Sequence, residues 1–132
     1  MNIVVDASVM VAVVANESEK DALIRMTQGA DLIAPNSIHW EIGNAFSAMF
    51  KRKRITLAQA QKAIEIYTSI PINFVDVDIR ESLKIADELG IYAYDAYLLQ
   101  CAIKFASPLI SLDRVLLAHA RQKRIRVMEV SQ

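Results

Sequence analysis

The stretch Ile3-Val4-Val5-Asp6 near the N-terminus constrains the fold more than any other part of the chain. Three β-branched residues in succession, with no polar residue between them, are typical of a strand buried on both faces. Asp6 ends this run. A carboxylate at the C-terminal end of a buried first strand lies where open α/β sheets bind their ligands. The alternative interpretation is that Asp6 only caps the helix that follows.

Segments with the pattern of strands alternate with helical segments along the rest of the chain. After the first strand, the expected strands are 31–34, 72–77, 108–112 and 126–130. The expected helices are 9–15, 18–28, a helix from 38 that ends in the basic run 51–54, and then 56–69, 79–89, 94–106 and 113–123. This alternation predicts a parallel sheet with right-handed crossovers and helices on both faces, which is a three-layer α/β/α sandwich.

Polar and glycine residues mark the expected ends of these helices. Ser18 and Thr56 are expected N-caps, and Asn36 or Ser37 is expected to cap the helix that follows the second strand. Gly29 and Gly90 are expected to terminate two helices, since glycine readily adopts the left-handed conformation found there.

The composition bounds the size and the partners of the protein. With 132 residues and 54% hydrophobic content, residues 1–132 are expected to form a single domain with a substantial core. The formal net charge is zero, so any nucleic-acid binding must come from a local patch. The basic run 51–54 is interpreted first as cations at the negative end of a helix, with an RNA-binding patch as the alternative.

The apolar run 9–15 is neither a signal peptide nor a membrane span. No basic residue precedes it, Asp6 interrupts the apolar stretch, and it is far shorter than the ~20 residues that cross a bilayer. We therefore expect a soluble, cytoplasmic protein that does not associate with a membrane.

Four acidic residues break buried patterns, and these are the candidate site residues. They are Asp6, Glu41, Asp95 and Asp113. Glu41 lies on the shoulder of the apolar stripe of its helix, whereas Asp95 lies in the middle of a stripe that continues through 98, 99, 102 and 106. Asp113 follows the fourth expected strand and would lie beside Asp6 if the first and fourth strands are neighbours.

Each of these acids also has an ordinary structural explanation. Asp95 and Asp113 stand near helix starts, where aspartate is a favoured N-cap, and Glu41 could form a salt bridge. These explanations do not account for four acids at the C-terminal edge of one sheet, where clustered carboxylates repel one another.

A divalent cation would remove this repulsion. Ligation by oxygen alone favours Mg²⁺ or Mn²⁺ over zinc, and metals held in this way perform phosphoryl chemistry. His39 and His119 are not needed for such a site and are interpreted as surface or interface residues.

Four segments together resemble the motifs of a known family. The segments are Ile3–Ser8, Trp40–Ala45, Tyr94–Ala102 and Ile110–Asp113. In order and spacing they resemble the four motifs of PIN-domain ribonucleases, with the greatest likeness to VapC toxins of VapBC toxin–antitoxin pairs. The resemblance covers the whole chain.

The resemblance implies strand order 3-2-1-4-5 and an endoribonuclease that depends on Mg²⁺ or Mn²⁺. It places the catalytic, metal-binding acids at Asp6, Glu41, Asp95 and Asp113. It also implies an RNA substrate, a small antitoxin partner and a homodimer.

Three polar residues have supporting roles under this resemblance. Asn44 would orient the Glu41 carboxylate or a metal-bound water. Ser111 stands where many relatives have threonine and keeps the hydroxyl, and Ser8 either contacts the metal water or phosphate or caps the first helix.

Other functions remain open at this point. The first is a PIN nuclease that works in RNA processing without an antitoxin, and the second is a non-catalytic RNA-binding module, which four retained acids disfavour. A phosphotransfer domain of the haloacid dehalogenase type needs a second aspartate where Ser8 stands, and a receiver domain needs a second acid and a lysine that the sequence does not place.

Overall fold

One parallel sheet organises the protein, whose computed structural model describes residues 1–131. Its strands are β1 (Asn2–Val5), β2 (Asp31–Pro35), β3 (Ile72–Val75), β4 (Leu109–Ile110) and β5 (Val127–Met128). They are arranged in the order β3-β2-β1-β4-β5, and every pairing is parallel. The predicted strand order is therefore confirmed.

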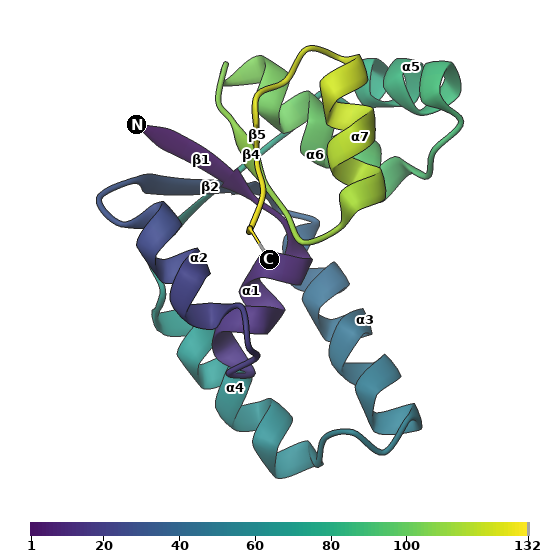
Figure 1. Ribbon diagram of the computed structural model, residues 1–132. Coiled ribbons are helices and arrows are strands. Elements are labelled where there is room, and N and C mark those ends of the chain that lie inside the picture. Colours follow the sequence, from purple (N-terminus) through teal and green to yellow (C-terminus); the bar gives the residue numbers. More distant parts are fainter. Residues whose placement is uncertain (132) are drawn as a thin grey trace.

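Helices cover both faces of the sheet. Their bounds are α1 (Ala7–Val14), α2 (Lys20–Thr27), α3 (Ile38–Lys51), α4 (Leu57–Ser69), α5 (Ile79–Leu89), α6 (Ala93–Lys104) and α7 (Arg114–Gln122). Figure 1 shows α1 to α4 gathered on one side of the sheet and α5 to α7 on the other. The predicted three-layer α/β/α sandwich is confirmed.

The alternation along β1 explains why this strand lies at the centre. Ile3 and Val5 pack into the core formed with α1 to α4, whereas Val4 packs into the core formed with α5 to α7. All three side chains are fully buried. A strand with apolar residues on both faces can be accommodated only where helices cover both faces, as the sequence predicts.

Several predicted helix ends are confirmed by their cap geometry. Thr56 and Gln59 form a reciprocal capping box at the start of α4. Asp113 caps α7 through its side chain. Gly90 ends α5 in the left-handed conformation, and Gly29 adopts a positive φ just after α2.

Two other predicted N-caps make no side-chain cap hydrogen bond. Ser18 does not cap α2, which begins at Lys20 with Glu19 at the N-cap position, and the Ser18 hydroxyl donates to the Glu19 carboxylate. Ser37 occupies the N-cap position of α3 without a side-chain cap, and the Asn36 amide instead binds Asp76 across the β2–β3 edge.

The last two strands are shorter than predicted. β4 comprises two residues instead of the expected 108–112, and β5 comprises two instead of 126–130. Beyond Ile110 the chain turns so that Ser111 and Leu112 bond to side chains instead of the neighbouring strand. The shortening of β4 therefore occurs where the chain builds a polar site.

Candidate active site

Asp6 is the most buried of the four acids and is held by three donors. Its side chain is 4% exposed. One carboxylate oxygen accepts from Ser8 Oγ at 2.7 Å and from the Val9 amide at 3.1 Å, and the other accepts from Ser111 Oγ at 2.5 Å. Asp6 thus caps α1 and also faces β4, so the two interpretations of this residue are compatible.

The register of the sheet brings Ser111 to Asp6. Val5 pairs with Ile110 across β1 and β4, so the residues that follow these partners leave the sheet side by side. Ser8 Oγ accepts from the Leu112 amide at 3.0 Å, and Ser111 Oγ accepts from the Asp113 amide at 2.9 Å. These bonds fix the loop after β4 against the start of α1.

Asp113 completes this side of the site. Its carboxylate accepts from the Val115 and Leu116 amides at the start of α7. The side chain remains exposed at the C-terminal edge of the sheet. Burial raises the pKa of Asp6 and of Asp95, and the negative charge of Asp113 raises both further.

Glu41 faces the site from the first turn of α3. Figure 1 shows α3 beginning beside the start of α1. Burial, followed by the charges of Asp6 and Asp95, raises the pKa of Glu41 to about 7. Its Oε2 atom is buried, and within residues 1–131 it has no hydrogen-bond partner. A buried carboxylate oxygen without a partner is costly, which favours a proton or a cation at this position.

Asp95 approaches from α6, where it is the third helical residue and not the predicted possible N-cap, a position that Tyr92 occupies. Its side chain is partly buried. Burial, followed by the charge of Asp113, raises its pKa, while His119 on α7 lowers it. Sequence analysis missed this role of His119, because nothing in the local pattern of α7 shows that it lies near Asp95.

The four acids form a ring of electrostatic neighbours. The charge of Asp113 acts on the pKa of Asp6 and of Asp95, and the charges of Asp6 and Asp95 act on the pKa of Glu41. The pKa values of Asp6, Glu41 and Asp95 are all raised, first by burial and then by the charges of neighbouring acids. The structure thus gathers the four predicted residues at one edge of the sheet.

The four acids offer the donor atoms that a divalent cation prefers, but their side chains lie too far apart to bind one as they stand. The donor set is all oxygen, and Glu41 Oε2 is unpartnered. Among the residues that the structure describes, however, no three His, Cys, Asp or Glu side chains are close enough together to hold a metal ion. The assignment of these four acids as metal ligands therefore stays a prediction, and it requires the side chains to draw together around the ion.

Asn44 does not contact Glu41 in this arrangement. It is exposed one turn further along α3, where its backbone carbonyl accepts from Ser47 Oγ. Its predicted role in orienting the Glu41 carboxylate stays a prediction.

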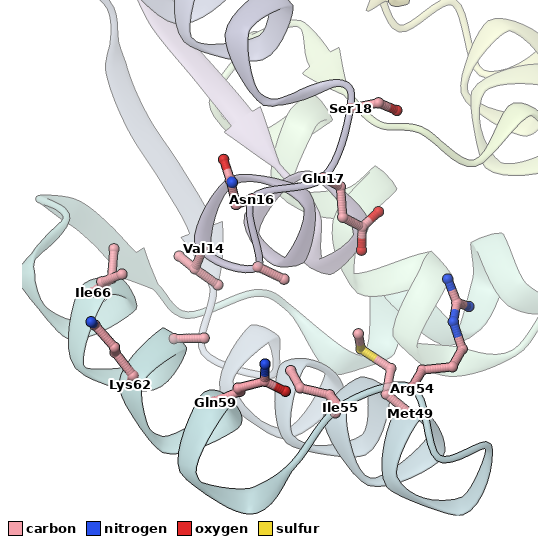
Figure 2. A pocket seen from close by; sticks show the side chains of 12 residues that line it. Val14, Asn16, Glu17, Ser18, Met49, Arg54, Ile55, Gln59, Lys62 and Ile66 are labelled. Carbon is pink, nitrogen blue, oxygen red and sulfur yellow. The ribbon is translucent and has the colours of Figure 1, made fainter.

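One cavity lies away from the acids. It has a volume of about 550 Å³ and lies between the loop after α1 and the α3–α4 connection. Figure 2 shows Glu17, Arg54 and Lys62 at its wall. The basic run 51–54 thus lies at the far end of α3 from Glu41, at a helix C-terminus, as its simpler interpretation predicts.

Removing the Ser111 hydroxyl should destabilise the protein. Ser111→Ala deletes a buried bond to the Asp6 carboxylate and leaves the Asp113 amide unpaired, so we expect a loss of about 1–3 kcal/mol in the free energy of unfolding. Chemical denaturation measures this loss. Ser107→Ala is the matched control, because Ser107 is also buried but its hydroxyl bonds only to the nearby Phe105 carbonyl. Equal losses in the two variants would contradict the role of Ser111.

The raised pKa of Glu41 predicts how stability depends on pH without metal. Between its ordinary value of 4.5 and its folded value of about 7, the folded state binds more protons than the unfolded state. The free energy of unfolding should therefore fall as pH rises through this window. Thermal melts in EDTA at several pH values between 4 and 8 measure the slope.

Glu41→Gln should flatten this pH dependence. Glu65→Gln, on the exposed face of α4, is the matched control and should retain the slope of the wild-type protein. A wild-type slope in Glu41→Gln would show that Glu41 does not titrate in this window.

The sequence and the structure identify the family. The sequence profile of the PIN domain matches residues 3–124, and the chain belongs to the PIN-domain family, whose members are nucleases. A comparison with curated proteins found no match. In the described residues, no helix is both long and apolar enough to cross a membrane.

Solved structures share the fold over nearly the whole chain. PAE2754 from Pyrobaculum aerophilum is 25% identical, with a TM-score of 0.74 over 98% of this chain and 92% of that chain. VapBC2 from Rickettsia felis, solved with a DNA fragment from its promoter, is 12% identical, with a TM-score of 0.69 over 98% of both chains. The sarcin–ricin loop cleaving toxin VapC20 from Mycobacterium tuberculosis is 16% identical, with a TM-score of 0.63 over 88% of this chain and 93% of that chain.

Proposed function

We propose that this protein is a divalent-metal-dependent endoribonuclease and the toxin of a toxin–antitoxin pair. The observation that carries the proposal is the ring of four acids at the C-terminal edge of the PIN sheet, with three pKa values raised and one buried carboxylate oxygen unpartnered. The structural likeness to VapBC2 and to VapC20 supports the toxin class, and VapC20 is a sarcin–ricin loop cleaving toxin.

Asp6, Glu41, Asp95 and Asp113 would hold Mg²⁺ or Mn²⁺. When bound, such an ion polarises a phosphate and lowers the pKa of a bound water. Asp6 is fixed in place by Ser8 and Ser111, so it serves as the rigid ligand. Glu41 would release its proton when the ion binds, because the positive charge of the ion offsets the burial and the neighbouring charges that raise the pKa of this carboxyl.

The test is cleavage of RNA by the purified protein. We expect internal cuts in the presence of Mg²⁺ or Mn²⁺ and none after EDTA is added. A protein that binds RNA but leaves it intact with either ion would instead support the non-catalytic module. A PIN nuclease without an antitoxin would cleave in the same way, so only its partners separate that alternative from a toxin.

The assembly of the protein provides that separation. We expect the isolated chain to be a homodimer, since exposed apolar side chains such as Ile79 and Leu83 lie on α5, and we expect a small antitoxin to co-purify from the native source. The antitoxin should insert a basic side chain among the acids and suppress cleavage. Light scattering at micromolar concentrations and mass spectrometry of the native complex measure both. A monomeric mass removes the dimer, and metal-independent activity of the complex removes the proposed inhibition.

A further inference from the structure

A second hollow lies beside the acids on the same edge of the sheet. It has a volume of about 210 Å³ and is lined where β2 and β3 end, by residues that include Asn36, Ser37, Asp76 and Tyr97. Ser37 precedes Glu41 by one helical turn, and Tyr97 follows Asp95 by two residues. The hollow therefore adjoins the acid site along α3, whereas Asp95 and Tyr97, two residues apart, lie on different sides of α6.

Ser37, which lines this hollow, carries an unsatisfied hydroxyl. Ser37 Oγ is buried, and in the described part of the chain it has no hydrogen-bond partner. Glu41 Oε2 shares this property, and residues four apart lie on the same side of a helix. Buried polar atoms without partners are few in folded proteins, so two on one side of α3 indicate polar groups that a ligand supplies.

Apart from the hydroxyls of Ser37 and Tyr97, which can also donate, the free side-chain polar atoms of Asn36 and Asp76 in the hollow are acceptors. The Asn36 amide nitrogen already donates to the Val75 carbonyl at 3.3 Å and to one Asp76 carboxylate oxygen at 2.9 Å. The Asn36 amide oxygen and the second Asp76 oxygen are left as free acceptors. A ligand that pairs with these two acceptors must therefore offer N–H or O–H groups, and amino groups are well suited.

Aromatic surface accompanies these acceptors. Tyr97 lines the hollow and packs edge to face with Tyr94, with ring centroids 6.0 Å apart. Trp40 lies on the same turn of α3 as Ser37, whose carbonyl accepts from the Trp40 amide, and is 71% exposed. Exposed aromatic rings next to a phosphate-cleaving site are surfaces on which unpaired bases stack.

We infer that this hollow binds one unpaired nucleobase that carries an exocyclic amino group, next to the RNA phosphate held at the acids. The inference rests on the proposed function. Asp76 and Asn36 accept from the amino group, Tyr97 supplies the stacking surface, and Ser37 bonds to a ring or sugar atom. Uracil has carbonyl oxygens where cytosine has its amino group, so it would place acceptors against acceptors. The hollow therefore selects cytosine over uracil at this position.

The experiment compares short cytidine and uridine homopolymers, which differ at the base in the amino group. Binding is measured with Asp95→Asn protein, so that no strand is cut, from the fluorescence of Trp40, the chain's one tryptophan. We expect quenching by both strands and an affinity for cytidine that is about fivefold higher or more. Tyr97→Ala should weaken both strands roughly tenfold.

Asp76→Asn tests the base preference directly. The new amide offers a donor where the carboxylate offered an acceptor, so the preference for cytidine should vanish or reverse. Asp21→Asn, which makes the same change on the exposed face of α2, is the matched control and should keep the preference. Equal affinities for the two strands without further mutation, or the same result from Asp76→Asn and Asp21→Asn, would overturn the inference.

Two further measurements separate this inference from its alternatives. If Asp76→Asn or Tyr97→Ala changes the mass of the protein in sedimentation and leaves the base preference unchanged, the hollow is an interface between copies of the chain and the inference fails. If unsubstituted protein cleaves no RNA with Mg²⁺ or Mn²⁺ while the cytidine preference holds, the proposed function fails and the pocket stands.

Discussion

Asp95→Asn should reduce metal-dependent RNA cleavage by roughly a hundredfold or more. Besides burial, the charge of Asp95 raises the pKa of Glu41, and the charge of Asp113 raises the pKa of Asp95. Asp95→Asn therefore removes one of the neighbouring carboxylates that would hold the ion. Losing several kcal/mol of stabilisation of a transition state that gains charge has an effect of this order. The measurement is kcat/KM for a fluorogenic RNA at saturating Mn²⁺.

A second variant tests whether Asp6 and Asp95 act together in cleavage. Asp6→Asn should lose activity to a similar degree, and the double variant should lose little more than either single variant, because residues that act together are not additive. Asp21→Asn should cleave like the wild-type protein. Robust cleavage by purified Asp95→Asn would remove the assignment of this residue to catalysis.

The core pattern of the chain is predictable from sequence because burial on both faces leaves a local signature. The β-branched run through Val5 and the capping signals at Thr56 and Gly90 each depend on neighbours within a few residues. The order of the strands came from the resemblance to the PIN family, since period and composition do not specify which strands are adjacent.

The candidate site is only partly predictable, because it depends on contacts between distant segments. The four acids stand out individually by breaking apolar patterns, and the structure gathers them at one edge of the sheet. The effect of His119 on the pKa of Asp95 and the unpartnered hydroxyl of Ser37 both depend on how the helices pack. No local sequence pattern predicts either feature. The predicted end of β4 is wrong for the same reason, because Ser111 leaves the sheet and its hydroxyl donates to Asp6.

The ring of acids also predicts how metal changes stability. Without metal, the carboxylates repel one another, so Asp95→Asn should melt no lower than the wild-type protein in EDTA. The helix dipole opposes this gain. Asp95 lies in the first turn of α6, where a negative charge stabilises the folded state by about 0.3–1 kcal/mol, and Asp95→Asn loses this stabilisation. Asp21→Asn makes the same substitution in the first turn of α2 and isolates that term.

Added Mn²⁺ should reverse the order of the melting temperatures. Binding to the folded state alone stabilises by RT ln(1 + [L]/Kd), or roughly 2.7 kcal/mol at a hundredfold excess over Kd, and Asp95→Asn should lose much of this gain. Asp21→Asn should keep all of it. Differential scanning fluorimetry with EDTA and with increasing Mn²⁺ measures the three proteins together. Because Tyr92 and not Asp95 occupies the N-cap of α6, a cap cannot explain a difference between the two variants. If Mn²⁺ shifts the melting temperature of Asp95→Asn as much as that of the wild-type protein, Asp95 is not a metal ligand.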